Sequence, residues 1–135
     1  MGVGELVTLF IVTMIIFLVI DIAWIGFIAK EHYDKALKKF IRKDPPPVRA
    51  AIFYCIFILG LLVMVLVPAI NEESLGIAMF RGAAFGFFTY ATYGLTNWTL
   101  IKNWPTRITL EDIAWGTFLS FAVSTIAYNI HIALF

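Results

Sequence analysis

Four long apolar stretches constrain the fold of this chain more than any other feature. They span residues 5–29, 49–70, 75–101 and 112–135, and they leave little of the 135 residues for a soluble domain. A helix of about 20 mainly apolar residues crosses the roughly 30 Å of hydrocarbon in a bilayer. We therefore predict an all-α membrane protein, in which residues 1–135 form a single transmembrane domain built as an antiparallel four-helix bundle.

Composition and motifs support this fold and argue against several function classes. Hydrophobic residues make up 61% of the chain and charged residues 14%, whereas soluble proteins average roughly 45–50% and 25%. The first stretch is too long for a signal-peptide core and no basic residue precedes it, so we expect it to be retained. The single cysteine, Cys55, excludes an intrachain disulfide. The sequence has no paired-histidine metal motif, phosphate-binding glycine loop or nucleic-acid motif, so we expect no metal, no cofactor and no nucleic acid.

Basic residues gather in the first and third loops between the predicted spans. By the positive-inside rule, these two loops face the cytoplasm and both termini lie on the outer side. The second loop carries Glu72 and Glu73, with Arg81 nearby as a candidate ion-pair partner. The basic residues are Lys30, Lys35, Lys38, Lys39, Arg42, Lys43 and Arg49 around the first loop, and Lys102 and Arg107 in the third.

The first loop also carries an amphipathic pattern. Large apolar residues recur at helical spacing among the lysines until three prolines, residues 45–47, end the pattern. This predicts a short interfacial helix after the first span, with its basic face on anionic headgroups. A solvated helical extension of the first span is the alternative. The apolar residues are Tyr33, Leu37, Phe40 and Ile41.

Small residues four apart mark one face of each of the last two spans. Such rows let helix backbones approach closely, which drives helix association in a membrane. A short loop joins these spans, so we predict that they pack as an antiparallel hairpin with the two rows in contact. Packing is favoured over a ligand role for the glycines. The rows consist of Ala78, Gly82, Gly86 and Gly94 in one span, and of Gly116, Ser120 and Ser124 in the other.

The tetrapeptide Asp-Ile-Ala-Trp occurs twice, at residues 21–24 and 112–115. Each copy puts a carboxyl in or against a membrane span, where an ionisable group costs roughly 2.5 to 3.5 kcal/mol on insertion scales and marks a candidate functional site. Counting from the cytoplasmic ends places polar residues of all four spans in one slab of the inner leaflet, roughly 7 to 13 Å deep. This candidate ligand-binding set comprises Asp21, Trp24, Tyr54, Tyr93, Thr96, Asn97, Asp112 and Trp115.

Members of this set have alternative structural interpretations. Trp24 and Trp115 also fit the deeper edge of the interfacial aromatic belt. Thr109 and Asp112 have the spacing of a capping box, so Asp112 is expected to begin the fourth helix. The small-residue row also predicts that Asn97 faces Asp112.

Asp21 has no helix end to cap. It lies more than two turns from the end of its helix, and no lysine or arginine is predicted at its depth. It must therefore be protonated or hydrogen-bonded by neighbouring helices, either for proton exchange and general acid chemistry or as a structural interhelical bond.

Several runs resemble a family of small bacterial membrane proteins of unknown function. They are the run Tyr-Ala-Thr-Tyr-Gly-Leu-Thr-Asn at 90–97, Trp-Pro at 104–105 and Asp-Ile-Ala-Trp-Gly at 112–116. The similarity extends over nearly the whole chain and implies a four-span protein of the bacterial inner membrane in a lipid context, with no established activity. The family usually carries Asp at the position of Gly94, so the resemblance implies that one acid of the family is missing here.

Our leading functional hypothesis is a binding protein for a hydrophobic or amphipathic, lipid-like molecule. Asp21, Tyr93 and Asn97 would hold its polar end, and Trp24, Tyr54 and Trp115 its body. The alternatives are a proton-coupled transporter that uses Asp21 and a cofactor-free lipid-modifying enzyme, although the lack of a cofactor or metal motif weakens the enzyme hypothesis. We expect membrane lipids as partners, with a second copy of the chain as a further candidate.

Overall fold

The chain is almost entirely helical. The computed structural model describes all of residues 1–135, of which 84% are helical, with no strand. Helix α1 (Val3–Ala23) continues through a π-helical segment (Trp24–Ile28) to the short α2 (Lys30–Ala36), and α3 (Pro47–Leu61) continues through a second π-helical segment (Leu62–Leu66) into α4 (Val67–Asn71). Helices α5 (Leu75–Leu100) and α6 (Thr106–Leu134) complete the fold.

Three helical units are long and apolar enough to cross a membrane, namely Val3–Ile28, Pro47–Asn71 and Thr106–Leu134. Helix α5 has 26 residues but is not one of these units, and it carries many threonines, tyrosines and glycines. The prediction of several membrane helices is therefore confirmed, and the fourth span stays a prediction. Only 27 of 135 residues are buried, and outward residues such as Phe27 and Phe80 are 83% and 76% exposed. Such an apolar outer surface is suited to lipid.

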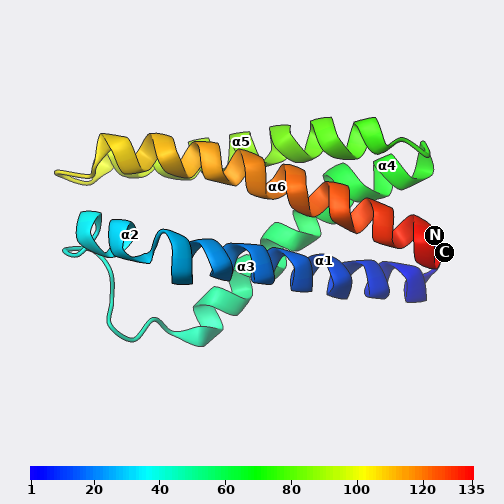
Figure 1. Ribbon diagram of the computed structural model, residues 1–135, viewed down its shortest axis with the longest axis horizontal. Helices are drawn as coiled ribbons and strands as arrows, with labels where there is room; N and C mark the ends of the chain where they lie inside the picture. Colours follow the sequence, from blue (N-terminus) through cyan, green and yellow to red (C-terminus); the bar gives the residue numbers. More distant parts are fainter.

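Helices α5 and α6 pack along their small-residue faces, as predicted, and lie alongside each other in Figure 1. A Cβ placed on Gly82 would lie 2.7 Å from the Ser124 hydroxyl oxygen. A Cβ on Gly86 would overlap the carbonyl oxygen of Gly116. Because the backbones approach this closely, larger residues cannot replace these glycines without separating the helices.

The π-helical segment between α3 and α4 has an identifiable cause. Pro68 lacks the backbone N–H that would bond to the Met64 carbonyl in a regular α-helix. The Arg81 side chain from α5 donates to the Met64 carbonyl oxygen at 3.4 Å. The predicted ion pair of Arg81 with Glu72 or Glu73 is therefore wrong, because the guanidinium satisfies a backbone acceptor instead.

The α5–α6 turn and the chain termini lie at opposite ends of the molecule (Figure 1). The α5–α6 turn and α2 share one end, while the two termini and the α4–α5 turn share the other. Helix α3 runs obliquely, and its N-terminal part lies away from α5. The membrane orientation and the interfacial position of α2 stay predictions. The helix itself is shorter than the pattern through Ile41 predicted, because α2 ends at Ala36 and turns follow.

Candidate functional site

The two Asp-Ile-Ala-Trp copies meet between antiparallel helices at the loop end of α1 and α6 (Figure 1). The indole rings of Trp24 and Trp115 stack with centroids 4.4 Å apart and planes 11° from parallel. Because the helices run in opposite directions, the two copies approach each other about an approximate two-fold axis. Each tryptophan lies three residues after its own aspartate, and therefore on the same helical face.

Asp21 is buried, with only 5% of its surface exposed, and it joins three helices. The Trp115 indole N–H of α6 donates to its Oδ1 at 3.3 Å, and the Tyr54 hydroxyl of α3 donates to its Oδ2 at 3.5 Å. No lysine or arginine pairs with this carboxyl. The interhelical hydrogen bonds that the sequence required for Asp21 are therefore present, with two of the predicted set as donors.

Asp112 has a different partner. The Tyr33 hydroxyl of α2 donates to its Oδ1 at 2.9 Å. Trp24, which occupies the position equivalent to Trp115, makes no such bond, and its indole nitrogen is buried without a partner. The approximate two-fold relation is therefore broken in the hydrogen bonds, although it holds in the ring stack.

The predicted capping role of Asp112 is wrong. Helix α6 begins at Thr106, directly after Pro105, and not near residue 112. The Thr109 hydroxyl donates to the Pro105 carbonyl oxygen at 2.9 Å and so makes an ordinary bond one turn back inside the helix. Asp112 thus lies in the second turn, where its carboxyl bonds to Tyr33. Both aspartates therefore have tertiary partners.

Two tyrosines beside these residues are absent from the set that the sequence predicts. Tyr33 was assigned to the apolar face of an interfacial helix, but it is buried and bonds to Asp112. Burial raises the pKa of the Tyr33 phenol above its ordinary value. The Trp24 indole beside the hydroxyl lowers this pKa in part, the charges of Asp112 and Glu111 raise it further, and the phenol therefore stays a hydrogen-bond donor. The Tyr90 ring covers Gly116, and a Cβ added to Gly116 would overlap the Tyr90 ring. Its place in the small-residue row of α5, opposite a glycine, was the available signal.

Three polar side chains on the surface lie next to Tyr33. His32 of α2 pairs with one carboxylate oxygen of Glu111, and Arg107 donates to the other at 2.7 Å. Arg107 and Glu111 are four residues apart on α6, a spacing that brings side chains together on a helix. Helix α2 is therefore attached to the beginning of α6 through two neighbouring residues, His32 and Tyr33.

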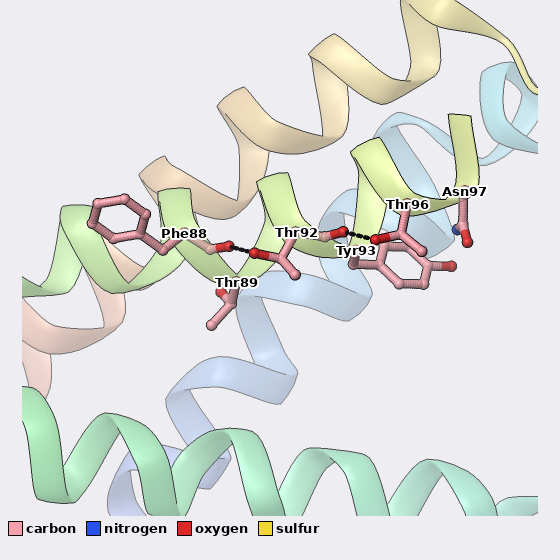
Figure 2. Close-up of a pocket in the computed structure, with 6 residues that line it drawn as sticks. All are labelled: Phe88, Thr89, Thr92, Tyr93, Thr96 and Asn97. Atoms are coloured by element: carbon pink, nitrogen blue, oxygen red, sulfur yellow. Dashed lines mark hydrogen bonds between the residues drawn. The ribbon is translucent and has the colours of Figure 1, made fainter. Parts of the chain in front are cut away.

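The other predicted site residues lie on an open groove of about 550 Å³ along one face of α5, which Figure 2 shows. The hydroxyls of its threonines donate to backbone carbonyls of their own helix. The side chains of Tyr93 and Asn97 make no hydrogen bond, and Tyr93 is 57% exposed. The groove is lined by Phe88, Thr89, Thr92, Tyr93, Thr96 and Asn97.

The predicted set therefore divides into two groups. The first group, which we call the cluster, contains five residues of the predicted set and Tyr33. Its members are Asp21, Trp24, Tyr54, Asp112, Trp115 and Tyr33. The groove contains the other three, Tyr93, Thr96 and Asn97. No hydrogen bond joins Asn97 to Asp112, so the prediction that they face each other is wrong. On α5, Gly94 faces Thr109 and Ile113 of α6. Asn97, three residues further along α5, therefore lies nearer the loop than Asp112 does.

Comparison with known proteins gives a family and no further relative. No curated protein and no solved structure matches the chain. The family model described as "Predicted membrane protein (DUF2177)" matches residues 6–129, a range that includes both tetrapeptides, the cluster and the groove. This chain therefore belongs to the predicted membrane protein family DUF2177, a family of unknown function.

Proposed function

We propose that this membrane protein binds an uncharged amphipathic, lipid-like molecule in the groove of α5. The observation that carries the proposal is the pair of unbonded polar side chains, Tyr93 and Asn97, in an open groove on the outer face of an otherwise apolar bundle. Polar side chains inside a membrane protein normally have a partner or serve a function. Here a partner from outside the chain would complete their hydrogen bonds.

The chemistry of the groove favours an uncharged head group. None of its six lining residues is charged. A charged head group in a low-dielectric environment without a counter-charge would pay a large desolvation cost. A hydroxyl, ester or amide can instead bond to the Tyr93 phenol and the Asn97 amide, each of which can donate and accept.

The groove also has an apolar end. It begins at Phe88, one turn after Phe85, and Phe85 is the residue of α5 that contacts Gly60 of α3. Phe57 of α3 also meets the Tyr90 ring, but α3 departs obliquely from α5 (Figure 1), and the face from Phe88 to Asn97 forms the open groove. A hydrocarbon chain would lie beside Phe88, and the head group would lie toward Asn97.

The cluster supports the groove in this proposal without contacting the head group. Asp21 bonds to Tyr54 of α3 and to Trp115 of α6, so it holds the helices behind α5 together. The sequence predicts Asp21 beside Tyr93 and Asn97, but Asp21 does not line the groove. We therefore assign head-group binding to Tyr93 and Asn97 alone.

Native mass spectrometry of the protein, purified in mild detergent, tests this proposal. We expect a co-purifying amphiphile on the unmodified protein and its loss from a Tyr93→Phe, Asn97→Leu double variant. The matched control is Asn129→Leu, which removes an exposed amide of α6 at the opposite end of the bundle. Equal ligand retention in the double variant and the control, or no bound molecule on any of them, would refute binding in the groove.

Proton exchange at the cluster is a second candidate function. It is favoured by the buried carboxyl of Asp21 and the half-buried carboxyl of Asp112, which are close enough for their charges to interact and have no basic partner. Carboxyls in such surroundings are typical of proton pathways in membrane proteins. The test is flux into vesicles driven by a pH gradient, which Asp21→Asn should abolish while the groove variants retain it. Flux that survives Asp21→Asn would contradict this candidate.

A further inference from the structure

Helix α2 is attached to the bundle by very few contacts. Of its seven residues only Tyr33 is buried, beside Ala29 and Ile108. Its side-chain bonds to α6 are the Tyr33 hydrogen bond to Asp112 and the His32 pair with Glu111. A helix of seven residues is too short to be stable alone in water. The position of α2 therefore depends on these contacts.

The connection between α1 and α2 has the features of a hinge. It consists of the π-helical segment Trp24–Ile28, none of whose residues is buried, followed by Ala29 with φ −108° and ψ 5° outside the helical region. Wide π turns interrupt the regular bonding of a helix and are frequent at functional sites. A rotation of α2 about this segment would break the packing of Tyr33 and Leu37 and the ring contact of Phe40 with Trp104. Segments held by so small a set of contacts open most readily.

The hydrogen bonds beneath α2 provide two alternative arrangements. In the structure the Tyr33 hydroxyl bonds to Asp112, and the Trp24 indole N–H lies beside that hydroxyl without forming a well-aligned hydrogen bond. At the equivalent position, the Trp115 indole N–H bonds to Asp21. If the Tyr33 side chain moved away, the Asp112 carboxyl would lose its hydrogen-bond donor. The Trp24 indole N–H, which needs an acceptor, could then donate to that carboxyl. The Trp24–Asp112 bond would then restore the approximate two-fold relation.

We propose that α2 is a hinged latch over the cluster. In the closed state, seen here, His32 and Tyr33 hold α2 on α6. In the open state α2 rotates away, Trp24 donates to Asp112, and the cluster becomes accessible from the loop end of the bundle. The unbonded Trp24 N–H disfavours the closed state, which brings the two states closer in free energy. The latch acts on the two aspartates and is independent of what the groove of α5 binds.

Thiol labelling of the purified protein in detergent tests the latch. In a Cys55→Ser background, Ile108→Cys places a reporter under α2, where Ile108 is 3% exposed, and Ala29→Cys is a second reporter if the first variant does not fold. Ala69→Cys, buried in the main core, is the control reporter. We expect N-ethylmaleimide to label the position under α2 several-fold faster after Tyr33→Phe or Glu111→Gln, with no change at Ala69→Cys.

Two further variants separate a latch from a structural contact. Asp34→Ala removes an exposed side chain of α2 that makes no hydrogen bond, so labelling should not change. Adding Trp24→Phe to Tyr33→Phe removes the donor of the open state and should slow labelling again. Labelling that stays unchanged after Tyr33→Phe, rises equally at the control reporter, or rises further with Trp24→Phe would overturn the proposal.

Discussion

The two Asp-Ile-Ala-Trp copies have the same sequence and different structural roles. Asp21 is buried near the end of α1 and bonds to side chains of two long helices, whereas Asp112 lies near the beginning of α6 and bonds to a short, weakly packed helix. Their rings meet in one stack, but only Trp115 uses its indole N–H. The local sequence therefore specifies the helical face and the ring position. The element that packs over each copy decides which hydrogen bonds form.

The residue after each copy adds to this difference. Gly116 follows the second copy and lies beneath the Tyr90 ring. Ile25 follows the first copy and is 48% exposed. The second copy is thus part of the closest helix contact in the molecule, and the first faces outward at the same point. Substituting these two residues, or the residues of each copy that form hydrogen bonds, tests how far the two copies are equivalent.

The largest effect is expected from Gly116→Ile, which gives the second copy the residue that follows the first. Its side chain would overlap the Tyr90 ring and separate α5 from α6, at a cost of about 3 kcal/mol in the free energy of unfolding. Ile25→Gly, the converse change, should cost about 1 kcal/mol, because Ile25 is largely exposed and glycine only weakens the helix. Unfolding in detergent mixtures followed by circular dichroism measures both. Equal losses would mean that the surroundings of the two copies do not differ as described.

Removal of the carboxyls should have a smaller effect. Asp21→Leu leaves two half-buried donors, Trp115 and Tyr54, without an acceptor, and we expect a loss of about 2 kcal/mol. Asp112→Leu releases only Tyr33 and should cost about 1 kcal/mol, lost mainly from the attachment of α2. Hydrogen exchange of the amides of α2 distinguishes the two. If Asp112→Leu destabilised the whole bundle as much as Asp21→Leu, Asp112 would not be specific to α2.

Periodic features of the sequence predicted the fold well. The small-residue rows identified the α5–α6 contact because close approach of two helices needs small residues at a fixed spacing, and Gly82 and Gly86 provide them. The apolar stretches identified the long helices for a similar reason. The common location of both tetrapeptides at the loop end followed from the chain reversing direction between spans.

Features that depend on tertiary contacts were not predictable in this way. Tyr33 reaches Asp112 only because the π-helical segment after α1 directs α2 back onto α6, and no local pattern indicates that turn. Pro105 could have indicated the beginning of α6 at Thr106, but the Thr109–Asp112 spacing imitated a cap inside the helix. The division between cluster and groove depends on the oblique path of α3, which leaves part of α5 uncovered.

The smallest expected effect gives the sharpest comparison, because it concerns the same substitution in both copies. Phenylalanine in place of either tryptophan keeps an aromatic ring at the stack but removes the indole N–H together with the fused pyrrole ring, so both variants lose similar packing. Trp115→Phe should cost about 1 kcal/mol more than Trp24→Phe, because only Trp115 donates to Asp21. In Trp24→Phe the loss of packing is partly offset, because the change removes a buried N–H that has no partner. The same unfolding titration measures both, and equal losses would show that Trp24 already bonds to an acceptor, so that the two copies are equivalent after all.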